Sequence, residues 1–394
     1  MIVPSDGDDA MTRRRLDRAV DLLRRLWRSG LARRPDLSEL ATHGRADGGG
    51  WRQALGRLVD SLEREAALNP VGLTFAHVQI TQLLRQRERA ERLWSARPDI
   101  AQVAIPRPIV VLGHMRSGTT RVQRLLGCDP RLNHTRFFEV MSPFPAALDW
   151  RLPASWAQLK MLHWLNPQLQ AVHPTAARDV EEAFGLLSFS FYGAQFEAQW
   201  HVPGFARWWE EQDRGWVYDE FRHLLQSIAW QRRASAAPFV LKAPQFMEDL
   251  EPLLDVFPDA RLICLSRNPE EVVTSSSSLV WNQMRIQSDS VSRAWIGREW
   301  LRKTARRDAI CAEVRARRSE VPQIDVAFDA VTADWRGQMR RVYSFLDLEL
   351  TAQVERRMER YLSAAEASGF RGHRYRSADF GLDRDIVRAA LSPA

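Results

Sequence analysis

The chain has 394 residues, a length that allows one large domain or two, and its 45% hydrophobic and 27% charged content is typical of a globular protein. The net charge of +7 suits an anionic ligand or an acidic surface. No block of lysine and arginine alternates with aromatic residues, so we do not expect nucleic acid as a partner.

Three cysteines, Cys128, Cys264 and Cys311, are too few and too scattered for a disulfide framework or a zinc site. The N-terminal residues lack the apolar region of a signal peptide, and no run of about 18 apolar residues is present to span a bilayer. We therefore expect a cytosolic protein without stable membrane insertion.

Residues 12–100 are predicted to be helical. Thr12 is a candidate N-cap, apolar residues at helical spacing follow it, and Gly30 ends this first helix. A second helix is predicted around 55–66 and a third at about 74–94, with arginines on the outer faces of all three. We interpret this region as a helical cap on the rest of the molecule.

A short apolar strand at 109–112 leads into the loop GHMRSGTT at 113–120, and a helical pattern follows. Gly113 and Gly118 allow close backbone approach, so that loop N–H groups and the positive end of the helix dipole can enclose a phosphate. The spacing is that of a P-loop, but Thr119 stands at the lysine of GxxxxGK[ST], and the loop cation is Arg116. The sequence therefore predicts an anion site that does not bind ATP.

Residues 135–150 are predicted to be loop-like, and 154–235 hold much of the tryptophan and phenylalanine without clean periodicity. Such density is typical of a core, with a pocket lined by aromatic rings as a second interpretation. Further strands are predicted at 239–242, 261–265 and 323–328, and further helices at 248–257, from 270, at 291–318 and at 335–346. This alternation predicts an α/β fold in which a P-loop-like parallel sheet is flanked by helices, with function at the carboxyl ends of the strands.

A second anion motif follows the strand at 261–265. Arg267 leaves the end of that strand, and Ser275 lies eight residues later, within the next helix. Both side chains can converge on one oxyanion, the arginine through a charge-assisted fork. A surface ion pair of Arg267 with a nearby glutamate is the alternative, and the serines at 276–278 leave open which serine acts. Two phosphate sites on neighbouring strands indicate a nucleotide with two separated phosphates.

These motifs resemble those of a known family. The loop GHMRSGTT resembles the 5′-phosphosulfate loop of sulfotransferases, and SRNP at 266–269 through Ser275 resembles their 3′-phosphate motif. LKAPQ at 241–245, FPDA at 257–260, the helical N-terminus, and the tail with HRY at 373–375 and DFGL at 379–382 are similar to a bacterial branch of that family. The resemblance covers almost the whole chain.

The resemblance implies transfer of a sulfuryl group from 3′-phosphoadenosine 5′-phosphosulfate to a hydroxyl of a small acceptor, which the aromatic content suggests is apolar or aromatic. It implies no metal. The residues implied to hold the 5′-phosphosulfate are Arg116, Ser117, Gly118, Thr119 and Thr120. Those implied to hold the 3′-phosphate are Arg267 and Ser275, with Arg371 and Gly372 as the remnant of a C-terminal nucleotide loop. Lys242, at the end of its strand, could stabilise charge on the transferring group.

The general base is where the sequence departs from the family. The bacterial branch often has a histidine after Lys-x-Pro-Gln, and Phe246 occupies that place. Removal of a hydroxyl proton needs a group such as histidine or a desolvated carboxylate. His173, shortly before the pair Glu181-Glu182, is the strongest substitute, because the branch has a comparable histidine and acidic pair. His201 and Glu139 come next.

The catalytic set predicted from the sequence is therefore Arg116, Lys242, His173 and Glu182. We expect one continuous globule, with residues 1–100 as the helical cap and 101–394 as the sulfotransferase-like α/β domain. An ATP-dependent P-loop phosphotransferase, or a family member that binds nucleotide without catalysis, are the alternatives.

Overall fold

The computed structural model describes residues 6–44, 50–167, 175–233, 237–367 and 376–391. The fold begins with helices α1 (Asp6–Arg28), α2 (Leu37–Ala41), α3 (Trp51–Arg64) and α4 (Pro70–Ala96). The side chain of Asn69 caps α4 by accepting from Gly72 N (2.9 Å), with Pro70 at the first helical position, where its missing N–H costs no helical hydrogen bond. The prediction that Thr12 caps the first helix is wrong, since α1 already begins at Asp6.

The centre of the molecule is a five-stranded sheet in the order β2-β3-β1-β4-β5. All of its pairings are parallel. The strands are β1 (Ile109–Leu112), β2 (Asn133–His134), β3 (Phe239–Lys242), β4 (Arg261–Ser266) and β5 (Gln323–Ala327). The predicted parallel α/β sheet is thereby confirmed. Both anion motifs follow neighbouring strands, β1 and β4, and so lie at the same edge of the sheet.

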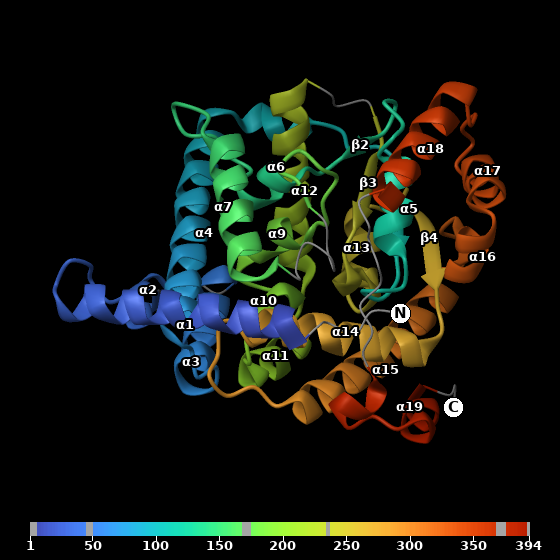
Figure 1. The fold of residues 1–394 in the computed structure, drawn as a ribbon. Helices are drawn as coiled ribbons and strands as arrows, with labels where there is room; N and C mark the ends of the chain where they lie inside the picture. Colours follow the sequence, from blue (N-terminus) through green and yellow to red (C-terminus); the bar gives the residue numbers. More distant parts are fainter. Residues whose placement is uncertain (1–5, 45–49, 168–174, 234–236, 368–375, 392–394) are drawn as a thin grey trace.

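Helices cover both faces of this sheet. After β1 the chain forms α5 (Thr119–Leu126), α6 (Phe137–Met141), α7 (Arg151–Leu165), α9 (Phe184–Leu187), α10 (Ala194–Gln199), α11 (Pro203–Glu210) and α12 (Gly215–Arg232). After β3 it forms α13 (Leu250–Val256), α14 (Pro269–Met284), α15 (Arg293–Arg317), α16 (Phe328–Ala333), α17 (Trp335–Phe345), α18 (Ala352–Ala367) and α19 (Arg384–Leu391). Figure 1 shows α16, α17 and α18 on one side of the sheet and α4, α7 and α12 on the other.

Side chains of β1 alternate between two cores, as the pleat of a strand requires. Val110 and Leu112 join a large cluster that also holds residues of α3, α4 and α12. Ile109 and Val111 join a second cluster with α5, α17 and α18. Helices α2, α3 and α4 thus share one apolar core with the sheet, whereas α1 packs in a separate cluster, and the boundary at residue 100 stays a prediction.

The segment before β3 differs from its sequence-based description. Residues 135–150 are not wholly loop-like, because α6 forms at Phe137–Met141 with Glu139 accepting from Arg136 N (3.0 Å). The aromatic-rich region is mostly helical, and most of its rings, such as Trp200, Trp209 and Phe196, are buried, whereas Trp156 and Trp164 are exposed. Among the described residues no helix is long and apolar enough to cross a membrane.

Candidate active site

The glycine loop between β1 and α5 is built on left-handed backbone. Gly113, Arg116 and Gly118 have φ of 148°, 71° and 90°. A Cβ on Gly118 would lie 2.2 Å from Cδ2 of Phe328, the first residue of α16, so this position needs glycine for its space as well as its backbone angle. The loop delivers the amino end of α5, where the first N–H groups have no acceptor within the helix, to the carboxyl edge of the sheet.

The second motif contacts this loop directly. Arg267 Nη1 donates to the carbonyl oxygen of Arg116 (2.8 Å), and Arg116 Nε donates to Ser275 Oγ (2.9 Å). Ser276 Oγ also donates to the carbonyl oxygen of Met115 (3.1 Å). The structure therefore brings Arg116, Arg267 and Ser275 together, and two neighbouring serines of α14 touch the loop.

Arg267 makes two further contacts. Its guanidinium pairs with Glu271 (2.6 Å), and it lies over the ring of Phe328 at 4.4 Å from the centroid. The surface ion pair that the sequence offered as an alternative is thus present, together with the contact to the glycine loop. Phe328 packs against both Gly118 and Arg267, and the sequence analysis missed it. Its place directly after β5, at the carboxyl edge, was the available signal.

A third cluster lies on the other side of the loop, where β3 neighbours β1. Lys242 is 1% exposed, and its Nζ lies 2.5 Å from Oε1 of Glu182. Thr120 Oγ1 of the glycine loop motif donates to the same carboxylate oxygen (3.3 Å). Ala183 N donates to the carbonyl oxygen of Lys242 (2.8 Å), which fixes the glutamate segment at the end of β3. The structure therefore places Glu182 and Lys242, both predicted as catalytic, beside the amino end of α5.

The other residues considered for the general base, and Phe246 at the family's histidine position, have their contacts elsewhere in the molecule. Phe246 is buried near the rings of Tyr218 and Phe221, so its side chain belongs to the core. Glu139 is ion-paired with Arg232. His201 lies against Trp295, with Nδ1 within 3.0 Å of the backbone oxygen of residue 65. None of these contacts involves the glycine loop.

Three predicted site residues, His173, Arg371 and Gly372, lie outside the described residues. Within the part of the chain that the structure describes, no group of three or more histidine, cysteine, aspartate or glutamate residues could hold a metal ion. The cations Arg116, Arg267 and Lys242 with the amino end of α5 form an arrangement suited to a multiply charged anion.

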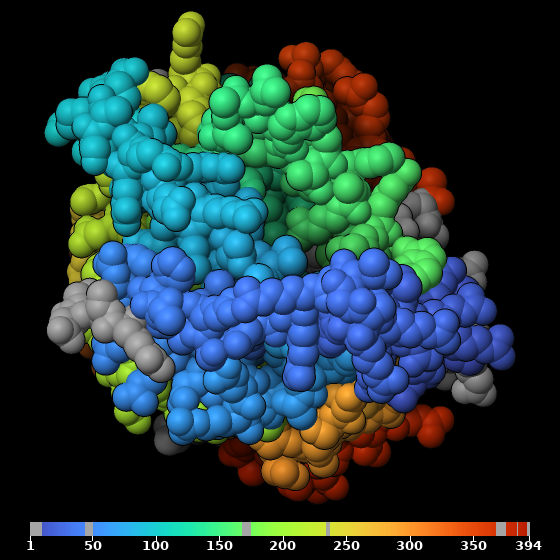
Figure 2. Space-filling view, turned by 90° about the vertical axis from the view of Figure 1, so that its left-hand side faces the viewer, coloured from blue at the N-terminus to red at the C-terminus, as the bar shows by residue number. Residues whose placement is uncertain are grey.

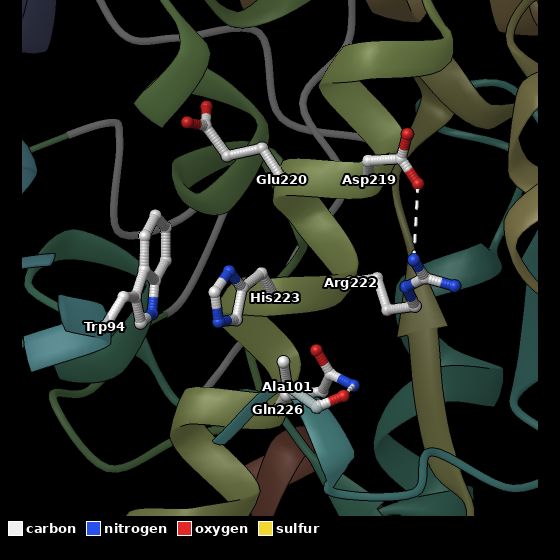
Figure 3. Close-up of a pocket in the computed structure, with 7 residues that line it drawn as sticks. All are labelled: Trp94, Ala101, Asp219, Glu220, Arg222, His223 and Gln226. Atoms are coloured by element: carbon white, nitrogen blue, oxygen red, sulfur yellow. Dashed lines mark hydrogen bonds and ion pairs between the residues drawn. The ribbon is translucent and has the colours of Figure 1, made fainter. Parts of the chain in front are cut away.

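A separate cavity of about 340 Å³ opens beside α12 (Figure 3). Trp94 and His223 stack there with ring centroids 4.0 Å apart, and Asp219, Glu220, Arg222, Gln226 and Ala101 complete the lining. None of these residues belongs to the glycine loop or to the turn after β4. The cavity is therefore not part of the anion site.

The chain is similar in sequence and in fold to known sulfotransferases. Residues 108–352 match the profile described as "Sulfotransferase family". The crystal structure of the sulfotransferase STF1 from Mycobacterium tuberculosis is similar, with a TM-score of 0.78 and 27% identity over 91% of this chain and 99% of that one. Sulfotransferase STF9 from Mycobacterium avium shares the fold, with a TM-score of 0.75 and 23% identity over 90% of this chain and 94% of that one.

A curated relative matches over a shorter stretch. It is the omega-hydroxy-beta-dihydromenaquinone-9 sulfotransferase Stf3 of Mycobacterium bovis, 28% identical over 180 residues. The same figures hold for the protein of that name from Mycobacterium tuberculosis. The alignment covers 44% of this chain and 45% of the relative, so this chain spans less than half the length of the curated relatives it matches.

Proposed function

This chain belongs to the sulfotransferase family, and on that premise we propose that it moves a sulfuryl group from 3′-phosphoadenosine 5′-phosphosulfate to a hydroxyl of a small apolar or aromatic acceptor. The observation that carries the proposal is the direct joining of two anion motifs. Arg267, from the turn after β4, is hydrogen-bonded to the backbone of Arg116 in the loop after β1. Two cationic motifs in contact are suited to one nucleotide with two separated phosphates.

The side chains of the two motifs are suited to the two charged groups of this donor. Arg116 with Ser117, Gly118, Thr119 and Thr120 would hold the 5′-phosphosulfate at the amino end of α5. Arg267 and Ser275 would hold the 3′-phosphate, with Arg371 and Gly372 as further contacts carried over from the family. Thr119 in place of the P-loop lysine disfavours the ATP-dependent alternative.

The transfer replaces the sulfur–oxygen bond to the nucleotide with a sulfur–oxygen bond to the acceptor. The acceptor loses its hydroxyl proton, and 3′-phosphoadenosine 5′-phosphate leaves. Lys242 would stabilise negative charge on the transferring group, and Glu182 or His173 would take the proton. For Glu182 this role requires Lys242 to exchange its ion pair for the sulfuryl oxygens, so that both residues change partners in the same step.

The acceptor class is proposed from the aromatic content and from a relative. Most aromatic rings of residues 154–235 fill the core, which leaves fewer of them to line a pocket. A curated relative carries the name of a hydroxylated menaquinone derivative, and by analogy we propose an apolar alcohol or phenol for this chain. We place the reaction in the cytosol, and no step in the scheme needs a metal ion.

A transfer assay tests the proposal. Purified protein would be incubated with donor carrying labelled sulfate and a panel of phenols, sterols, isoprenoid alcohols and sugars, with and without a chelator. We expect chelator-insensitive labelling of at least one apolar acceptor. Magnesium-dependent hydrolysis of ATP without sulfate transfer would favour the phosphotransferase instead. Binding of the product nucleotide without transfer to any acceptor would favour a non-catalytic family member, the alternative that Phe246 keeps open.

A further inference from the structure

The outer face of α7 is apolar. Its exposed residues are Pro153, Ala154, Trp156, Ala157, Lys160, Met161 and Trp164. The preceding turn adds Leu148 and Trp150, which are 68% and 65% exposed. A surface helix ordinarily carries charged and polar residues on its solvent side. Within α7 that side carries one charge, and the ammonium of Lys160 lies 3.6 Å from the ring centroid of Trp156.

Exposed apolar side chains concentrate on this side of the molecule. Nine large hydrophobic residues are exposed among those described, and eight belong to α1, α4, α7 or the segments directly beside them. Figure 2 looks onto this face, where α1 lies across the view with α4 and α7 above it. We call the set Leu148, Trp150, Trp156, Met161 and Trp164 the α7 face. A contiguous exposed apolar patch of this kind marks an interaction site.

A strongly basic segment borders the α7 face. α1 packs on both α4 and α7 through a cluster that includes Leu16, Val71 and Leu165. Arg15 Nη1 donates to the carbonyl oxygen of Trp164 (2.7 Å), which fixes the contact. Residues 11–34 contain nine arginines and two aspartates, a net charge of +7, and the acidic residues that flank this segment in the sequence are Asp6, Asp8, Asp9, Asp36 and Glu39. Apolar aromatic surface and dense positive charge therefore lie side by side.

A shallow groove adds two more cations at the other end of the face. It has a volume of about 540 Å³ and lies between α4 and the turn before α7. Arg89 and Arg92 form one part of its lining, and residues 145–147, a proline and two alanines, form another. Guanidinium groups next to an apolar wall match the junction of a lipid phosphate and its acyl chains.

We propose that the α7 face with residues 11–34 is a peripheral docking surface for an anionic membrane. Tryptophan rings favour the level of lipid headgroups, and arginines beside them attract anionic lipids. The positive charge of this surface argues against a second copy of this chain as its partner. In a two-fold dimer the same patch faces itself, so two segments of charge +7 would meet. The proposal goes beyond the proposed reaction, because docking requires no particular chemistry at the anion site.

Vesicle co-sedimentation of the full chain tests the proposal. The probes are vesicles of phosphatidylcholine alone and of phosphatidylcholine with about 30% phosphatidylglycerol, a content chosen to give the surface negative charge. We expect binding to the anionic vesicles that weakens about tenfold or more between about 0.05 M and 0.5 M salt, because salt screens the attraction. Failure of the wild type to bind anionic vesicles at low salt overturns the proposal.

Two variants separate the apolar from the charged contribution. Trp156→Ala with Trp164→Ala, and independently Arg18→Glu with Arg25→Glu, should each lower vesicle partitioning by about tenfold or more. The matched controls lie away from this face. Ile386→Ala removes the ninth exposed hydrophobic residue, on α19, and Arg356→Glu with Arg360→Glu reverses two exposed charges on α18. Both controls should partition like the wild type.

Two results would contradict docking of the α7 face on a membrane. Equal partitioning of the tryptophan double variant and the wild type would show that the α7 face does not dock. Concentration-dependent dimers that the same variant abolishes, without vesicle binding, would assign the face to contact between copies. Circular dichroism of each variant establishes that it is folded. Labelled-donor transfer to a water-soluble acceptor, unaffected by these variants, separates failure of docking from failure of the proposed reaction.

Discussion

At the scale of single residues, Arg267 links the two anion motifs. Its guanidinium bonds the carbonyl oxygen of Arg116, pairs with Glu271 and lies over the ring of Phe328. The ring and the glutamate hold the guanidinium at the glycine loop, so that less side-chain entropy remains to be lost when an anion binds. Arg267 is therefore a preorganised clamp in the proposed site.

Arg267→Ala should weaken the binding of 3′-phosphoadenosine 5′-phosphate by roughly 1.5–3 kcal/mol, the scale of a hydrogen bond to a charged group. Isothermal titration measures this loss. Glu271→Ala is the matched control, since it removes the exposed pair and keeps the arginine, and it should change the affinity by less than about 1 kcal/mol. Equal affinity of Arg267→Ala and the wild type would show that Arg267 only supports the loop.

Lys242→Met should lower kcat by about a hundredfold or more, because a buried cation at a developing charge acts mainly in the transition state. Affinity for 3′-phosphoadenosine 5′-phosphate should be nearly unchanged, since that nucleotide lacks the transferring group. Lys242→Arg keeps the charge and should retain more kcat. Steady-state rates and titration together check the prediction, which fails if kcat and nucleotide affinity fall in parallel.

At the scale of elements, the turn from β1 to α5 depends on close packing by α16. Phe328 fills the space beside Gly118, and the same ring supports Arg267. The loop, the clamp and the start of α16 therefore form one packed unit at the carboxyl edge of the sheet.

Gly118→Ala should destabilise the protein by about 2 kcal/mol or more, because alanine is strained at φ of 90° and its Cβ collides with Phe328. Gly56→Ala is the control, since a Cβ there meets nothing within 4 Å in the middle of α3, and it should stabilise by about 0.5–1 kcal/mol. Urea unfolding measures both. Similar stabilities for the two variants would contradict the packing of Phe328 on the loop.

The same elements show what a sequence can predict. The strands β1, β3 and β4 were predictable because each is a short, mostly apolar run, and β5 because Ile324 and Val326 alternate with the polar Gln323 and Asp325. β2 was not, since its two residues carry no pattern of their own and become a strand only by pairing with Phe239 and Val240. Helix α7 lacks a single apolar stripe, because it exposes Trp156 and Trp164 while it buries Leu159 and Leu165.

The candidate site also has a part that the sequence predicts and a part that it does not. The two anion motifs were predictable, because each is contiguous in the chain and spacing alone defines it. The ion pair of Lys242 with Glu182 was not, although each residue was a candidate, because it joins residues 60 positions apart and depends on the order of the strands. Phe328 was missed, and Ser276 could not be told apart from the neighbouring serines, because their contacts with the loop arise only from tertiary packing.

At the scale of the whole molecule, the buried His134 makes its own contribution to the pH dependence of stability. His134 ends β2, and burial together with the guanidiniums of Arg232 and Arg136 lowers its pKa from 6.5 to about 4. Between these values the unfolded chain binds the proton and the folded protein does not. His134 therefore stabilises the fold above about pH 6.5, and this contribution is lost as the pH falls towards about 4.

His134→Gln should remove this pH dependence. Between about pH 7 and about pH 4.5 the wild type should lose about 2–3 kcal/mol more unfolding free energy than the variant, from a pKa difference of this size. Denaturant unfolding at the two pH values measures the difference. Equal losses in both proteins would mean that His134 is protonated as readily when folded as when unfolded.

The central claim is that one nucleotide with two separated phosphates occupies both anion motifs. Isothermal titration of the wild-type protein with 3′-phosphoadenosine 5′-phosphate, adenosine 5′-phosphate and magnesium ATP tests it most directly. We expect the first ligand to bind about tenfold or more tightly than the second, since the second lacks the phosphate assigned to Arg267 and Ser275, and magnesium ATP to bind weakest. Equal affinity for the first two ligands, or tightest binding of magnesium ATP, would contradict the account.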